Sequence, residues 1–169
     1  SCSSEIRGVW SGGWNGSALQ NTIDYVTIRS TGNAFDFGDL NNTIQLPTAF
    51  SNNIRGIIGG GQSPTNMTAL DYITFSSTGN AFFFGDLTVA RQNLYAVAST
   101  TRGVVAGGLT PDRTNVIDYV TIASAGDALD FGDCTAPKDG SAGLASATRG
   151  IFTAGTAPGA NNAIEYITI

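Results

Sequence analysis

Residues 102–122 read RGVVAGGLTPDRTNVIDYVTI, and this pattern recurs along the chain. Arg-Gly opens each copy, at Arg7, Arg55, Arg102 and Arg149, and an acid-Tyr pair follows, with the acids at Asp24, Asp71, Asp118 and Glu165. Three copies continue to a Gly-Asp pair, with the acids at Asp39, Asp86 and Asp133. The period of about 47 residues is typical of stacked or radial repeat proteins, whose units bury their apolar faces against each other. We therefore expect one repeat domain over residues 1–169, with units 1 to 4 at 1–48, 49–95, 96–142 and an incomplete 143–169.

Each unit contains four short segments that favour β-strands. In unit 3 they are residues 96–99, 103–108, 116–122 and 128–131, separated by turn residues, and nothing in the unit favours a helix. The third segment carries apolar residues on both faces, with Ile117 on one and Val120 and Ile122 on the other. Such a strand is expected to lie in a sheet packed between two others. The sequence therefore predicts an all-β fold of four-stranded antiparallel units.

The second strand of each complete unit ends in Gly-Gly, at 12–13, 60–61 and 107–108. We expect small residues there because propeller blades converge on a central axis. A Gly-Gly strand followed by a strand with an acid before Tyr resembles the kelch-type β-propeller repeat. In this chain Phe37, Phe84 and Phe131 stand where that family carries a Trp. Four blades, a fragment of a six- to eight-bladed propeller, and an open β-repeat stack with edges that pair between chains all fit the strand count.

A longer motif, Thr-Gly-Asn-Ala-x-x-Phe-Gly-Asp-Leu, occurs at residues 31–40 and 78–87. Together with Asp-Tyr-Val/Ile-Thr-Ile and Arg-Gly-Val/Ile, it resembles the repeats of virion structural and tail-fibre proteins of marine tailed phages. That resemblance implies a structural or receptor-binding component at the virion surface or outside the cell. It implies other virion proteins or further copies of the chain as partners, and it carries over no catalytic residue.

Composition and charge exclude further classes of function. Eight Lys and Arg stand against 13 Asp and Glu, a net charge of −5, so we expect no nucleic-acid partner. There is no apolar run near 18 residues, and so we expect no membrane insertion. The first residue is Ser1 rather than Met, which suggests a processed chain or a fragment.

Histidine is absent, which excludes the usual triads and histidine-bound metals, and no phosphate-binding loop is present. We expect a non-enzymatic protein with no catalytic residue and no cofactor. A hydrolase that uses two carboxylates is the remaining catalytic alternative.

Several residues are interpreted from their column, the set of equivalent positions in the four units. Cys2 and Cys134 replace hydrophobic residues, which predicts two buried free thiols rather than a disulfide or a metal site. Trp10 falls in the column of Ile58, Val105 and Phe152 and is therefore expected in the core.

The repeated charged residues are interpreted as structural. One Arg and one or two acids per unit suggest ion pairs or Arg-to-carbonyl hydrogen bonds between strands. The alternative is a ring of charge around an axial pore. Calcium binding by Asp39, Asp86 and Asp133 is a second alternative, but the Asp-x-Asp-x-Asp spacing of a calcium loop is missing, so no metal is expected.

Variation between units is concentrated at one end of the expected meander. There the loops between strands 2 and 3 (14–22, 62–69, 109–115 and 156–163) meet the links between units (41–48, 88–95 and 135–142). Variable loops on a constant scaffold usually carry binding specificity, although exposed loops also vary without any function.

The candidate binding residues are Trp14, Asn15, Met67, Phe83 and Arg113. Trp14 is a candidate platform for a cell-surface glycan or a protein. Phe83 replaces Asp36 and Asp130 and is a candidate contact between subunits. The alternative function is an extracellular carbohydrate- or protein-binding β-propeller module.

Overall fold

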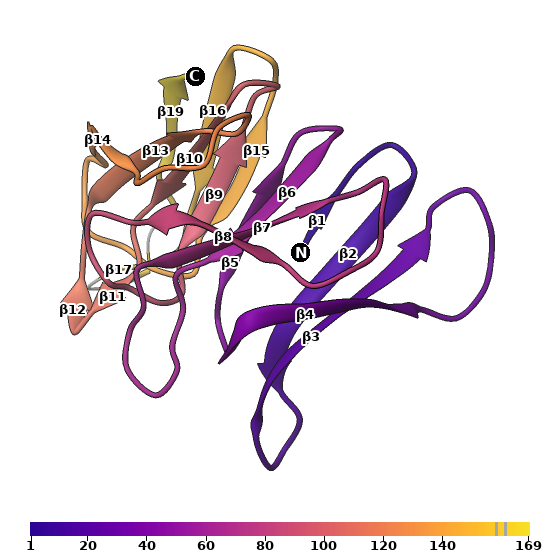
Figure 1. Ribbon diagram of the computed structural model, residues 1–169. Helices are drawn as coiled ribbons and strands as arrows, with labels where there is room; N and C mark the ends of the chain where they lie inside the picture. The colour runs from indigo at the N-terminus through magenta and orange to yellow at the C-terminus, as the bar shows by residue number, and fades with distance from the viewer. Residues whose placement is uncertain (158, 161) are drawn as a thin grey trace.

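The computed structural model describes residues 1–157, 159–160 and 162–169, and these residues form β-strands, turns and loops without any helix. Four antiparallel sheets follow each other along the chain (Figure 1). Sheet 1 contains β1 (Cys2–Ser3), β2 (Arg7–Trp14), β3 (Leu19–Thr27) and β4 (Phe35–Ile44). Sheet 2 contains β5 (Thr48–Ser51), β6 (Arg55–Gly59), β7 (Ala69–Thr74) and β8 (Phe82–Asp86).

Sheet 3 contains β9 (Tyr95–Ala98), β10 (Arg102–Ala106), β13 (Val116–Thr121) and β14 (Leu129–Asp133). Sheet 4 contains β15 (Ala142–Ala145), β16 (Arg149–Thr153) and β19 (Ile164–Thr168). Two small hairpins, β11 (Leu109–Thr110) with β12 (Asp112–Arg113) and β17 (Thr156–Ala157) with β18 (Gly159–Ala160), lie in the loops that precede β13 and β19. The all-β prediction and the antiparallel order of each unit are therefore confirmed. In the described part of the chain, no helix could span a membrane.

The turn between the first two strands is built in the same way in every unit. A side-chain oxygen accepts hydrogen bonds from two backbone N–H groups that follow it, as Ser99 Oγ does from Thr101 and Arg102. The residues that play this role are Ser4, Asn52, Ser99 and Ser146. These short polar side chains stabilise a tight turn by replacing backbone acceptors.

The core consists of three apolar layers, one between each pair of consecutive sheets. Val9 and Ile23 of sheet 1 pack in one cluster with Ile58 of sheet 2. Ile57 of sheet 2 packs with Val105 of sheet 3, and Val104 of sheet 3 packs with Phe152 of sheet 4. Neighbouring residues of one strand thus face opposite layers, which explains why the strands are apolar on both faces.

The first strands of the four sheets contact each other in sequence order, β1 with β5, β5 with β9, and β9 with β15. Residues of all four strands, among them Ser3, Ser51, Ala98 and Ala145, line one open groove. The first strands therefore face a common space on the same side of the molecule.

Trp10 contradicts its prediction. Its column is fully buried in the other three units, but the Trp10 side chain is 52% exposed. Among the described residues, no sheet packs against that face of sheet 1. Cys2 is likewise only half-buried rather than buried, whereas Cys134 is buried, and both are free thiols as expected. Burial raises the pKa of Cys2 to about 11, so its thiol stays protonated at neutral pH.

The Gly-Gly pairs play a different structural role from the one predicted. Gly60 and Gly107 have φ of 59° and 58°, a left-handed conformation that other residues adopt at a cost. A Cβ on Gly107 would lie 2.5 Å from the Lys138 carbonyl, and one on Gly60 would lie 2.5 Å from Leu94. Leu94 and Lys138 belong to the links that leave units 2 and 3, so the first glycine of each pair makes room for the link that leaves its own unit rather than for blades converging on an axis.

Candidate functional site

The Thr-Gly-Asn-Ala motif forms a joint between units, which we call the clip. In sheet 2, Gly79 N–H donates to the Phe37 carbonyl at 2.7 Å and Ala81 N–H to the Asp39 carbonyl at 2.8 Å. Asn80 Oδ1 in turn accepts from Asp39 N–H at 3.0 Å. The turn 125–128 makes the same three contacts with β8, from Gly126, Ala128 and Asp127. The clip thus attaches the outer strand of one sheet to the next sheet.

The four repeated arginines occupy equivalent environments. Each guanidinium lies over the ring of the Tyr that follows the acid, with Cζ-to-centroid distances of 4.6–4.7 Å. Arg55 Nη1 also donates to the Ile122 and Ala123 carbonyls of the next sheet at 3.2 and 2.9 Å, and Arg7 donates to the Phe75 carbonyl. The ion pairs found among the described residues involve other basic residues. The arginines therefore contact aromatic rings and carbonyls, not carboxylates.

The acids before Tyr hold the links. Asp71 accepts from Asn41 N–H at 3.0 Å and from its side-chain amide at 2.7 Å. Asp118 accepts from Thr88 Oγ1 at 2.6 Å, and Glu165 accepts from Thr135 Oγ1. Each acid thus fixes the start of the link that arrives from the preceding unit. Asp24 occupies this position in sheet 1, where it is exposed.

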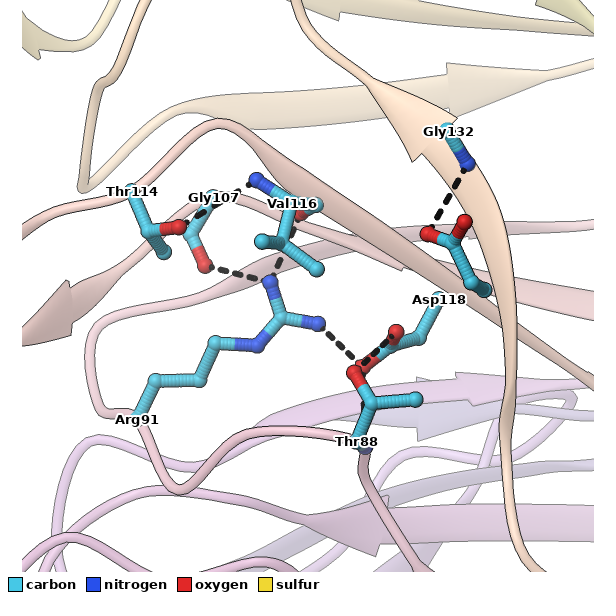
Figure 2. Close-up of polar contacts among 8 residues, drawn as sticks. Thr88, Arg91, Gly107, Thr114, Val116, Asp118 and Gly132 are labelled. Atoms are coloured by element: carbon cyan, nitrogen blue, oxygen red, sulfur yellow. Dashed lines mark hydrogen bonds and ion pairs between the residues drawn. The ribbon is translucent and has the colours of Figure 1, made fainter.

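A buried ion pair reinforces the link between units 2 and 3, as Figure 2 shows. Arg91 Nη2 lies 2.6 Å from Asp118 Oδ2, and both side chains are completely buried. Arg91 Nη1 donates to the carbonyls of Gly107 and Val116 at 3.1 and 2.7 Å. Burial lowers the pKa of Arg91, and the adjacent Asp118 carboxylate opposes that effect. Sequence reasoning missed this residue, although its column, Ile44, Arg91 and Lys138, changes from apolar to cationic.

Lys138 plays the corresponding role between units 3 and 4. Its Nζ is buried and lies 3.1 Å from Glu165 Oε2. Burial acts to raise the pKa of Glu165, but the hydrogen bond from Thr135 and the contact with Lys138 outweigh it, so the net shift is downward.

We expect sheet 4 to loosen in acid. Because the folded-state pKa of Glu165 lies below its ordinary value of 4.5, the carboxylate stabilises the fold above that pH, and this stabilisation is lost as the pH falls through the folded pKa. Hydrogen exchange of the β16 and β19 amides should therefore accelerate below about pH 4. Glu165→Gln should remove this pH dependence. Equal acid sensitivity of the variant and the parent chain would contradict the assignment.

The links between units also fix the bases of the variable loops. Isolated antiparallel bridges join Gln45 to Gln62 and Gln92 to Leu109, and a third joins Asp139 to Thr156. In each bridge a link residue pairs with the residue that follows Gly-Gly in the next unit, or Ala154-Gly155 in unit 4. The loop bases are therefore fixed by backbone hydrogen bonds, and their tips project beyond them.

Trp14 lies at the end of β2, opposite Leu19, and its side chain is 58% exposed. Asn15 closes the loop tip, because its Oδ1 accepts from the N–H groups of Ser17 and Ala18, each at 2.9 Å. The indole is thus presented on an ordered hairpin, and the loop that joins β2 to β3 is the lowest in Figure 1.

The other candidate binding residues are less accessible to a partner at the loop end. Arg113 Nε is paired with Asp139 Oδ1 at 2.5 Å, and Met67 is half-buried against an apolar layer. Phe83 is 56% exposed, as the sequence predicted, but it lies on β8 just after the clip turn and away from the loop end. Three loops thus bring Trp14, Asn15, Met67 and Arg113 to one end, and Phe83 is separate from them.

The described residues contain no group of three or more Cys, Asp or Glu side chains placed to hold a metal ion. Asp86 Oδ1 accepts from Thr68 Oγ1 at 2.7 Å, so this repeated acid takes part in the scaffold. Comparison of the sequence with protein-family models gives no match, and comparison with curated proteins gives none either.

Proposed function

We propose that this chain is a non-enzymatic structural or receptor-binding component of a phage virion, such as a tail fibre or surface appendage. In this proposal its sheets are kelch-like blades, and the variable loops at one end make the contacts. The observation that carries it lies at the loop end, where Trp14 is exposed at the closed end of the ordered β2–β3 hairpin, while the loop bases of units 2 to 4 are bridged to the links. A rigid base with an exposed aromatic side chain is the usual form of a binding anchor.

The charged repeat residues support a scaffold rather than a catalytic site. Asp71, Asp118 and Glu165 are engaged by link residues, and the four arginines lie on tyrosine rings. These acids hold three separate joints and do not converge in one cleft, as two-carboxylate hydrolysis would require. The groove shared by β1, β5, β9 and β15 supports a propeller-like arrangement, because inner strands of blades line a common channel.

Location on the virion is tested by electron microscopy of the source particle with gold-labelled antibody against this chain. We expect the label on fibres or surface appendages. Purified particles that lack the chain by mass spectrometry would overturn the virion proposal.

The loop contact is tested with two exposed aromatic residues. We expect Trp14→Ala to lose binding to intact host cells, and Phe83→Ala, at a similarly exposed residue of β8 away from the loop end, to keep it. Equal binding by the two variants would contradict the assignment of the contact to the loop end. A glycan array probed with the same proteins distinguishes the alternative, a carbohydrate-binding module, which the exposed indole favours.

A further inference from the structure

The two ends of the row of sheets expose apolar residues whose equivalents in the internal sheets are buried or half-buried. We define the N-terminal face as Trp10, Val26, Ile28 and Ala34 of sheet 1. Trp10 and Ile28 are more than half exposed, whereas their equivalents in sheets 2 and 3 are at most 4% exposed. In those sheets the same positions pack against the preceding sheet.

The C-terminal face consists of Leu144, Ile151, Ile164 and Tyr166 of sheet 4. Ile164 is 72% exposed, although its equivalents Ile23 and Leu70 are completely buried. In sheets 1 to 3 these positions pack against the following sheet. The N-terminal and C-terminal faces are therefore the two halves of the interface that the chain already forms three times.

We propose that the C-terminal face of one copy docks on the N-terminal face of a second copy. The C-terminal face of the second copy docks in the same way on the N-terminal face of the first. The three interfaces between consecutive sheets of one chain are the model for this contact, because each of them packs the same repeat positions against each other. Ser3 of sheet 1 and Ala145 of sheet 4 line one groove, so the row of sheets curves around it. Continued curvature lets two copies close into a ring that leaves neither face exposed.

The internal interfaces also specify individual contacts. A Cβ on Gly56 would lie 2.7 Å from Cys2 Sγ, one on Gly103 would meet Phe50, and one on Gly150 would meet Val97. Leu144 is next in the column of Cys2, Phe50 and Val97, and Gly8 is the glycine of sheet 1. Leu144 of one copy is therefore placed against Gly8 of the other, where it takes the place of the Trp10 ring that covers Gly8 in the single chain.

A second contact follows from the arginines. Arg7 donates to the Phe75 carbonyl and Arg55 to the Ile122 carbonyl, in each case in the next sheet. The equivalent acceptor in sheet 1 is the carbonyl of Ile28, in the same column as Phe75 and Ile122. Arg149 of one copy is thus placed to donate to Ile28 of the second.

The mass of the chain in solution tests the docking. Sedimentation should show a concentration-dependent species of twice 17.4 kDa that does not grow further, because a closed ring has no free face. Ile164→Asp should leave a monomer that melts at the same temperature as the parent chain at concentrations too low for it to dimerise, because the side chain is mostly exposed in the single chain. Phe83→Asp, at an exposed apolar residue outside both faces, should still dimerise. Trp14→Ala should dimerise too, so this result is independent of loop binding.

Three outcomes would overturn the proposal. They are a wild-type monomer up to roughly 100 μM, a hundredfold above a micromolar Kd, unlimited growth with concentration, and a dimer lost in Phe83→Asp but kept in Ile164→Asp.

Disulfide trapping tests the register directly. In a Cys2→Ser background, Gly8→Cys combined with Leu144→Cys should form a covalent dimer under mild oxidation. Gly8 tolerates the change, because its nearest neighbour, the Trp10 ring, would lie 3.4 Å from the new Cβ. The control pair, Gly8→Cys with Phe83→Cys, should stay monomeric on a non-reducing gel. Equal trapping of both pairs would indicate random collision and would overturn the register.

Discussion

Asp118→Ala should destabilise the protein by about 3–5 kcal/mol, because it leaves the Arg91 guanidinium buried without a counter-charge. Arg91 is 0% exposed and its Nε already lacks a hydrogen-bond partner, so the Asp118 carboxylate is the group that neutralises it. Thr88 would lose its side-chain acceptor at the same time. Urea denaturation followed by tryptophan fluorescence and circular dichroism measures the change in the free energy of unfolding.

Arg91→Ile is the matched control, because Ile44 occupies this position in unit 1. There Asp71 is satisfied by Asn41 without any cation beside it. In Arg91→Ile, Asp118 would keep its hydrogen bonds from Thr88 and the cavity would be filled by an apolar side chain. We expect a loss of only about 1 kcal/mol, since replacing a buried charge by a hydrophobic residue is often nearly neutral. If Arg91→Ile is the more damaging variant, the buried pair is not organised as described.

The repeat made most of the fold predictable. Because Ile117 and Val120 place apolar side chains on opposite faces of one strand, the sequence indicated a sheet packed between two others, and sheets 2 and 3 confirm this. The recurrent acid-Tyr and Arg-Gly pairs indicated structural residues, since positions that recur at one period meet equivalent neighbours.

Burial at the ends was not predictable from the columns. Trp10 shares its column with Ile58, but burial of that column requires a sheet on the preceding side, and among the described residues none packs against that face of sheet 1. The residues of a column show that the position is suited to a core. Whether it is buried depends on whether a neighbouring sheet covers it.

The contacts that join the units could not be predicted from the sequence either. Arg91 meets Asp118 across 27 residues, and the clip joins Asp39 to Asn80 across 41. Neither pairing is visible in the local periodicity of a strand. Within the candidate site, the exposure of Trp14 could be predicted from its loop position, whereas the pairing of Arg113 with Asp139 could not.

Gly85→Ala should destabilise the protein by about 3 kcal/mol, because the new methyl group would collide with backbone rather than with a movable side chain. A Cβ on Gly85 would lie 2.2 Å from the Gly126 carbonyl oxygen and 2.4 Å from its carbon. The clip would have to move away, which breaks the hydrogen bonds from Gly126 to Phe84 and from Ala128 to Asp86. Hydrogen exchange should show the Gly126 and Ala128 amides losing protection before the rest of sheet 3.

Gly132→Ala isolates this collision from the conformational cost of replacing glycine. Gly132 has the same place in unit 3 and a φ of 129°, but nothing lies within 4 Å of its Cβ position, because no clip of this chain covers β14. Only the left-handed conformation then opposes alanine, a cost of about 1 kcal/mol. If the two variants lose equal stability, backbone conformation explains the recurrent glycine, and the close approach of the clip does not.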